Sequence, residues 1–264
     1  WYDNNDWDIL KEKLKYSDGI FAVSDWCREY FVRKTGIDRV KTILNGINLD
    51  RLRNSENTTY TRKNLGINDN EKIFLTVAAF TQGKHQMGLI GIMEEIMKSR
   101  KDIKFLCVGH MLDLGYYKKF MKVYEKSVAA KNIILLDYVP QEEMGSFIKT
   151  MCDVYMQPSI HEAGVPLTVM EALCSGKPVL MTDFLVRKTF PKSDAIFLAP
   201  TPYANIDDVT PAVANKIALK TKTRATKIFV EQIIHIADNI EEITASIDVN
   251  DYSFLSKDNM IKKY

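Results

Sequence analysis

The chain has 264 residues, of which 46% are hydrophobic and 27% are charged, and its formal net charge is +2. This length and composition allow a sizeable buried core. Because the net charge is small, it creates no electrostatic field that would attract nucleic acid, and no nucleic-acid partner is expected. The apolar runs, such as Ile73–Phe80, are too short to span a bilayer.

The first predicted elements lie in Ser17–Cys27. A short strand ends there at Ser24 and is followed by a helix whose cap is Ser24 or Asp25. A second short strand then leads to Asn45-Gly46, a pair that suits a turn with positive φ. By pattern alone, this stretch could belong to any α/β protein.

Runs rich in β-branched or aromatic residues alternate with helical periodicities along the chain. The predicted strands are Ile20–Val23, Thr42–Leu44, Ile73–Val77, Ile103–Val108, Ile133–Leu136, Val154–Met156, Val179–Met181 and Ile196–Leu198. The predicted helices include Met87–Met97, Tyr116–Val128, Glu142–Met151 and Leu167–Cys174. Strands separated by helices indicate a parallel sheet with helices on both faces, and such sheets bind ligands outside the carboxyl ends of their strands.

The last part of the chain, from about Asp207, is predicted to be helical and to end in a Lys-rich tail. Basic residues from Lys216 to Lys227 predict a basic helix face, either solvated or close to anionic lipid. The four cysteines are widely spaced in apolar segments, which predicts buried free thiols in a reducing compartment. Since Trp1 opens a polar stretch without a signal-peptide pattern or an initiator methionine, we expect a fragment of a cytoplasmic protein, with peripheral membrane contact left open.

A candidate anion site follows the predicted strand Val154–Met156. A loop with Gly164 leads there to a helix that begins near Pro166, and proline suits the first turn of a helix. Free N–H groups and the positive dipole end at a helix start suit a nucleotide diphosphate, and Gly164 lets the backbone approach it. Glu171 is expected on the same face as Gly164, where its carboxylate can accept hydrogen bonds from two ribose hydroxyls.

Several segments resemble one protein family. Asn132–Asp183 carries, in order, V-P, D-V, P-S, G-V-P-L and E-A-L-C-S-G-K-P-V, and Phe74–Gln86 and Phe105–His110 resemble further elements of that family. Over roughly Asp18–Pro200 the chain is thus similar to the GT-B-fold retaining glycosyltransferases of the family-4-like type, the glycosyl transferases group 1.

The resemblance implies an α/β chain of the GT-B type with a Rossmann-like parallel sheet. Residues 1–40 would be the end of an N-terminal acceptor domain and a hinge, residues 41–222 a nucleotide-sugar donor domain, and residues 223–264 C-terminal helices. The implied reaction transfers a sugar, with retention, from a nucleotide-diphosphate sugar to a hydroxyl of a glycan, lipid or protein acceptor. No cofactor beyond this donor and no metal are expected, and turnover is expected to need the rest of the acceptor domain.

The resemblance also implies roles for particular residues. In the family, an arginine and a lysine neutralise the leaving diphosphate. Lys84 matches the lysine, whereas Ala79 stands at the position of the arginine, and Arg187 or Lys188 could supply a substitute charge.

The two glutamates of the family signature match Glu162 and Glu171, although the spacing here is E-x8-E instead of the usual E-x7-E. Glu171 would bind the ribose and Glu162 the donor sugar, unless His161 or neither residue takes that place. The other expected donor-binding residues are Gly109, Gly164, Val165, Pro166 and Leu167.

Other interpretations stay open. Ala79 and the altered spacing also fit a degenerate, non-catalytic nucleotide-sugar-binding module. An epimerase or a phosphorylase of the same fold is disfavoured, because the P-S, E-A and G-x-P-V block is the arrangement of the transferases. Asp6-Trp7-Asp8 is a D-x-D motif but follows no apolar strand, and the four histidines lack the spacing of zinc ligands, so no metal site is predicted.

Overall fold

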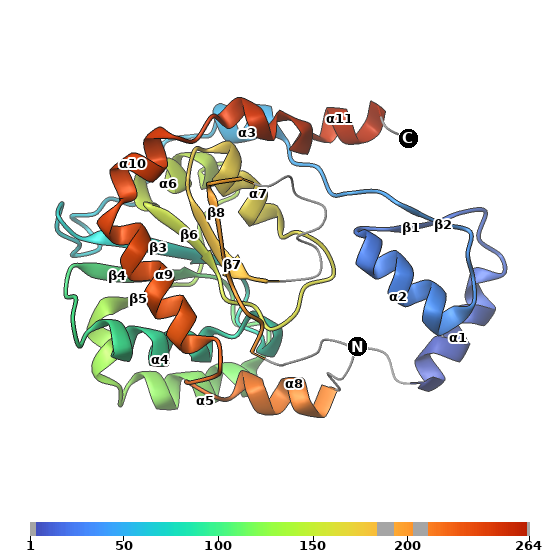
Figure 1. Ribbon diagram of the computed structural model, residues 1–264, viewed down its shortest axis with the longest axis horizontal. Helices are drawn as coiled ribbons and strands as arrows, with labels where there is room; N and C mark the ends of the chain where they lie inside the picture. Colours follow the sequence, from blue (N-terminus) through green and yellow to red (C-terminus); the bar gives the residue numbers. More distant parts are fainter. Residues whose placement is uncertain (1–3, 184–192, 203–210, 263–264) are drawn as a thin grey trace.

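The computed structural model describes residues 4–183, 193–202 and 211–262, and its centre is a six-stranded parallel sheet with the strand order β5-β4-β3-β6-β7-β8. These strands are β3 (Lys72–Val77), β4 (Ile103–Val108), β5 (Ile133–Leu136), β6 (Val154–Gln157), β7 (Val179–Thr182) and β8 (Ile196–Ala199). The sheet confirms the predicted α/β class, and Figure 1 shows helices on both of its faces.

The helices that cover the sheet come from the whole length of the chain. They are α3 (Leu49–Arg53), α4 (Gln86–Ile96), α5 (Leu114–Tyr124), α6 (Met144–Met151), α7 (Leu167–Cys174), α8 (Pro211–Ala218), α9 (Thr226–Asp238), α10 (Ile240–Ala245) and α11 (Lys257–Lys262). Among the described residues there are also the 3-10 helices η1 (Gln82–Lys84), η2 (Val128–Asn132) and η5 (Val249–Leu255).

The two faces of the sheet carry separate cores, as the alternation along β3 illustrates. Phe74 points into a cluster with side chains of α4, α5 and α9, whereas Ile73 and Leu75 point into a cluster with α6 and α7. All three are fully buried. Successive residues of a strand face opposite sides, so an uninterrupted apolar run is what a strand covered on both faces requires.

The N-terminal segment forms a smaller unit beside the sheet (Figure 1). It consists of α1 (Asn4–Leu14), β1 (Ile20–Ala22), α2 (Asp25–Thr35) and β2 (Val40–Thr42), and β1 and β2 pair in parallel. The predicted second strand therefore lies two residues earlier than expected, and β2 spans the predicted domain boundary at residue 40, a boundary that stays a prediction.

The predicted positive φ at Asn45-Gly46 is wrong, because Gly46 is not among the glycines with positive φ. The reason for glycine here is close backbone packing. A Cβ on Gly46 would lie 2.7 Å from the Cα of Lys257. The neighbouring Ile47 donates its N–H to Leu255 O and accepts one from Lys257 N, both at 2.8 Å, so the C-terminal segment pairs with this connection.

The predicted basic face near the C-terminal helices does not form on one helix. Lys216 lies on α8 and Lys227 on α9, and between them Lys222 lies 2.5 Å from Glu95. Within the described ranges, no helix is both long and apolar enough to cross a membrane.

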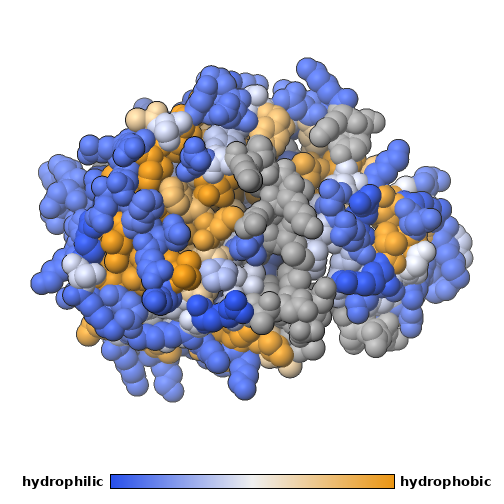
Figure 2. All heavy atoms as spheres, viewed as in Figure 1, coloured by the Kyte–Doolittle hydropathy of each residue, from blue (hydrophilic) through white to orange (hydrophobic). Residues whose placement is uncertain are grey.

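The cysteines are all free thiols, as predicted, but only Cys107 and Cys152 are fully buried, whereas Cys27 and Cys174 are half-buried. Figure 2 shows apolar side chains on the surface of the N-terminal unit. Phe21 of this unit is 62% exposed. A two-stranded sheet covers its apolar side chains incompletely.

Candidate functional site

Lys84 lies at the carboxyl edge of the sheet, in the turn η1 between β3 and α4. The residue after it, His85, has a φ of 54°, the only positive φ of a non-glycine residue among those described. Its buried ring lies 3.2 Å from Lys220 O, and burial lowers the pKa of His85 to about 4, so the ring is neutral. This packed, left-handed residue fixes the direction in which the chain leaves Lys84.

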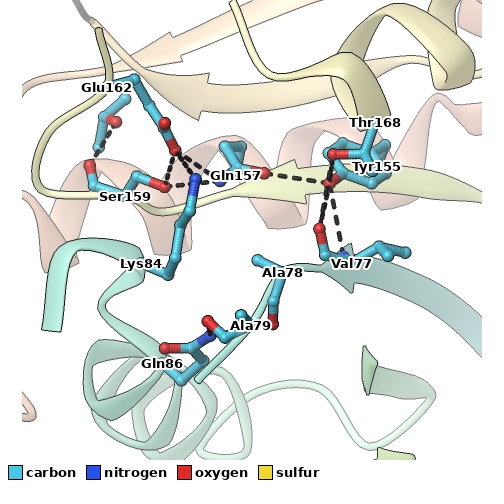
Figure 3. A network of polar contacts seen from close by, with 11 residues as sticks. Val77, Ala78, Ala79, Lys84, Gln86, Tyr155, Gln157, Ser159, Glu162 and Thr168 are labelled. Carbon is cyan, nitrogen blue, oxygen red and sulfur yellow. Dashed lines mark hydrogen bonds and ion pairs between the residues drawn. The ribbon is translucent and has the colours of Figure 1, made fainter. Parts of the chain in front are cut away.

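Lys84 and Glu162, which the sequence predicted as site residues, form an ion pair of 2.5 Å (Figure 3). The same carboxylate oxygen accepts hydrogen bonds from Ser159 Oγ at 2.8 Å and from Gln157 Nε2 at 3.2 Å. Glu162 is only 12% exposed, so its charge is balanced mainly by these groups. The loop after β6 thus holds the carboxylate beside the lysine in spite of the altered spacing.

The polar network continues from Gln157 to the start of α7 (Figure 3). The hydroxyl of Tyr155 lies 3.0 Å from Gln157 Oε1, 2.6 Å from Thr168 Oγ1 and 3.2 Å from Val77 O. Both Tyr155 and Gln157 are buried. A fully paired buried network of this kind holds its members in one arrangement, so it links the position of Glu162 to the first turn of α7.

Replacing Gln157 by leucine is expected to lower the free energy of unfolding by about 1–3 kcal/mol, because buried partners on both sides lose a hydrogen bond. Urea denaturation of the two proteins measures this difference. The matched control is Gln232→Leu, since Gln232 on α9 is half-buried and its side chain makes no hydrogen bond to a described residue. A variant as stable as the wild type would contradict the role of the network.

The loop before α7 brings together the other predicted donor-binding residues. Val165 is buried, Pro166 is the N-cap of α7 and Leu167 is its first residue, half exposed. The expectation that proline lies inside the first turn is thus wrong by one position. Gly164 likewise lies before the helix and does not share a helix face with Glu171, because the chain is extended at Pro166, with a ψ of 137°.

The start of α7 lacks a side-chain cap. The first N–H groups of a helix have no partner within it, so they remain available to an anion, and the helix dipole favours one. The predicted anion site is therefore compatible with the geometry of this turn.

Glu171 points to a partner that the sequence did not indicate. Arg51 Nη2, on α3, lies 2.5 Å from Glu171 Oε1. The side chain of Glu171 is 7% exposed, and burial raises its pKa while Arg51 opposes that rise. The carboxylate thus faces α3, with an arginine beside it.

Gly109, at the end of β4, packs on the segment after β3. A Cβ on it would lie 2.0 Å from Ala78 O. Next to Ala78, the Ala79 carbonyl accepts a hydrogen bond of 2.9 Å from Gln86 (Figure 3). The substitute charges predicted at Arg187 and Lys188 lie outside the described residues.

The N-terminal unit contacts the loop that carries Glu162. Ser24 caps α2, as predicted, and its hydroxyl also donates to Ala163 O at 2.6 Å. His161 lies edge-on to Trp26, with ring centroids 5.7 Å apart, and burial lowers the pKa of His161 to about 4. Both rings line an apolar cavity of about 350 Å³ between α1, α2 and this loop, so His161 lies toward the N-terminal unit.

Metal-ligating side chains do not gather around this site. Within the described ranges, no group of three or more histidine, cysteine, aspartate or glutamate residues is arranged to hold a metal ion. Asp6 and Asp8 of the D-x-D motif lie on α1.

Comparisons with known proteins identify the family of the chain. A family model described as "Glycosyl transferases group 1" matches residues 57–208. A glycosyltransferase from Methanocaldococcus jannaschii, itself uncharacterised, is 30% identical over 149 residues, which are 55% of this chain and 37% of that protein. The chain thus matches little more than a third of that relative.

Solved structures resemble nearly the whole chain. Sucrose-phosphate synthase from Thermosynechococcus elongatus has a TM-score of 0.73 at 15% identity, over 99% of this chain and 60% of that one. HepE from Anabaena, in complex with UDP-glucose, has a TM-score of 0.66 at 16% identity, over 99% of this chain and 68% of that one. The catalytic domain of starch synthase IV from Arabidopsis thaliana, bound to ADP and acarbose, has a TM-score of 0.64 at 13% identity, over 96% and 58%. These likenesses confirm the predicted GT-B fold.

Proposed function

Because the chain belongs to the glycosyl transferases group 1 family, we propose that it supplies the donor-binding half of a glycosyltransferase. The reaction moves a sugar, with retention of configuration, from a nucleotide-diphosphate sugar to a hydroxyl of a glycan, lipid or protein acceptor. The bond between the anomeric carbon and the diphosphate breaks, a bond to the acceptor oxygen forms, and the acceptor hydroxyl loses its proton.

The observation that supports this proposal most directly is the Lys84–Glu162 pair at the carboxyl edge of the sheet. The ammonium group of Lys84 would stabilise the negative charge of a diphosphate beside it. The N–H groups at the start of α7 would stabilise the same charge further. Fixed donors of this kind stabilise the negative charge that develops on the leaving group in the transition state. Glu162, released from Lys84, would then accept hydrogen bonds from sugar hydroxyls.

The nucleoside would lie between the ends of β4 and β5 and the helix α7. Glu171 there is the candidate partner of the ribose, and Gly109 allows a close approach to the strand ends. HepE has been solved with UDP and with UDP-glucose, and starch synthase IV with ADP. The panel of candidate donors therefore starts with uridine and adenosine diphosphates and their sugars.

The acceptor side is proposed to include the N-terminal unit. The apolar cavity there is bounded by His161, the neighbour of Glu162 in sequence. A cytoplasmic location, contact with a membrane surface and independence from metal ions remain predictions. Transfer that continues undiminished in the presence of a chelator would support the last of these.

A second function, a binding module without turnover, has one observation in its favour. Ala79 stands where the family resemblance predicts an arginine, so one of two cations at the diphosphate is missing. Binding of a nucleotide sugar without transfer, in the complete protein with its acceptor present, would favour this alternative.

The proposal predicts that one nucleoside diphosphate or nucleotide sugar raises the melting temperature of the chain. A ligand at 100 times its Kd adds about 2.7 kcal/mol to the stability of the folded state. Replacing Glu171 by alanine is expected to remove most of this shift, whereas Glu242→Ala, on an exposed part of α10, leaves it intact. A chain that no member of the panel stabilises would contradict the proposed function.

A further inference from the structure

Arg51 and Glu171 meet although they are 120 residues apart in sequence. Arg51 lies on the short helix α3, which Asn48 caps, and its side chain is 30% exposed. Glu171 lies on α7 and is 7% exposed. The ion pair therefore connects the first element after the hinge with the helix whose start forms the candidate diphosphate site.

The guanidinium makes a second contact toward the nucleoside side of the site. Arg51 Nη1 lies 3.4 Å from the carbonyl oxygen of Gln141, in the loop after β5. That loop follows a strand end at the same edge of the sheet as Lys84. Arg51 thus spans the gap between this loop and α7. Its hydrogen bond to Glu171 goes to Oε1, and no described group donates a hydrogen bond to Oε2.

Arg51 also opposes the effect of burial on the carboxyl of Glu171. Burial raises the pKa of Glu171, and Arg51 is the group that lowers it. Two further titratable groups among the described residues interact with this carboxylate, Tyr155 on β6 and Cys174 on α7. Burial raises the pKa of both, so both are neutral at pH 7. A protonated carboxyl would lose half of its ability to accept from a pair of hydroxyls.

We propose that Arg51 is a positioning residue for nucleotide binding, which holds the carboxylate of Glu171 charged and oriented with Oε2 open to the ribose hydroxyls. This inference rests on the proposed function, because it needs a nucleotide in the site. It adds that two residues from distant segments of the chain together recognise the ribose. Arg51 would thus determine how strongly the site prefers a ribonucleotide to an analogue without the ribose hydroxyls, without contacting the phosphates.

The test compares a ribonucleotide with its 2′,3′-dideoxy analogue by calorimetry, with whichever diphosphate binds wild type most tightly. Hydrogen bonds to a charged group contribute enough that loss of the hydroxyls should raise the Kd of wild type by about tenfold or more. In Arg51→Met, the ribonucleotide should bind more weakly, and the difference in Kd between the two nucleotides should be clearly smaller than in wild type. Arg51→Lys should restore part of the discrimination, and Arg53→Met, an exposed arginine on the same helix, should retain all of it.

The pH dependence separates positioning from a merely structural role. Without Arg51 the pKa of Glu171 is higher, so discrimination in Arg51→Met should fade with falling pH sooner than in wild type, where it should persist. Arg51→Gln serves as a second variant if Arg51→Met does not fold. Full discrimination in both variants at every pH, or tighter ribonucleotide binding, would overturn the inference and leave the proposed function intact. Absence of any nucleotide binding by wild type would overturn both.

Discussion

Lys84→Ala is expected to weaken the binding of a nucleoside diphosphate by about tenfold or more, and to reduce kcat for sugar transfer by about a hundredfold or more. Charge-assisted hydrogen bonds to phosphate contribute about 1.5–3 kcal/mol, and removal of one fixed donor for developing charge typically costs about 10²–10³ in kcat. Ala79 stands where the family resemblance predicts the second cation, so Lys84 is the predicted phosphate-binding cation among the described residues of this site. The Kd measured by calorimetry and the kcat of the complete protein check the two parts.

A loss of fold could imitate that result, because Lys84→Ala also leaves Glu162 without its cation in a site where it is 12% exposed. The double variant Lys84→Ala, Glu162→Gln removes the unpaired charge and should recover stability without recovering nucleotide binding. The matched control is Lys119→Ala, on an exposed face of α5, which should bind as wild type does. Unchanged affinity in a folded Lys84→Ala protein would exclude a phosphate role for this residue.

Gly109→Ala is expected to reduce the free energy of unfolding by about 3 kcal/mol, because an added methyl group overpacks the site. Its Cβ would lie 2.0 Å from Ala78 O and 2.5 Å from Ala78 C, and the φ of Gly109 is 158°. Backbone hydrogen bonds continue past the strand ends here, from Gly109 N to Leu136 O at 3.0 Å and from Phe80 N to His110 O at 2.8 Å. The methyl group therefore pushes apart the segments that lead to Lys84.

Urea denaturation measures the loss of stability, and calorimetry with the nucleotide shows whether the site is lost as well. Gly83→Ala is the matched control, because Gly83 lies at the same carboxyl edge of the sheet as Gly109. Gly83 has no positive φ, and no atom lies within 4 Å of a Cβ added to it. If Gly109→Ala were as stable as Gly83→Ala, the close packing between the ends of β3 and β4 would not be the reason for glycine at this position.

Local patterns in the sequence were enough to predict most of the fold. The buried run from Ile73 predicted a strand covered on both faces, and β3 is covered on both faces. Ser24 or Asp25 was predicted as a cap from residue type and position, and Ser24 caps α2. Such predictions succeed because a strand's alternation and a helix cap depend on residues within a few positions of one another.

Part of the candidate site was also accessible from the sequence. Lys84 and Glu162 were named because they match a lysine and a glutamate of the family that the sequence resembles, and the two side chains form an ion pair. Gln157 was missed, although a polar residue at the carboxyl end of an apolar strand is a usable signal. Arg51 offered no signal, because many arginines on short helices are solvated.

By itself, the sequence determined the alternation of strands and helices, the parallel sheet and the edge at which polar side chains gather. Only the tertiary structure decided which of those side chains are partners. Arg51 meets Glu171 across 120 residues, Ser24 meets Ala163 across 139, and Gly46 is needed because Lys257 packs on it. These contacts depend on how whole elements pack against one another, and packing distances of a few ångströms are not encoded in the period of any local pattern.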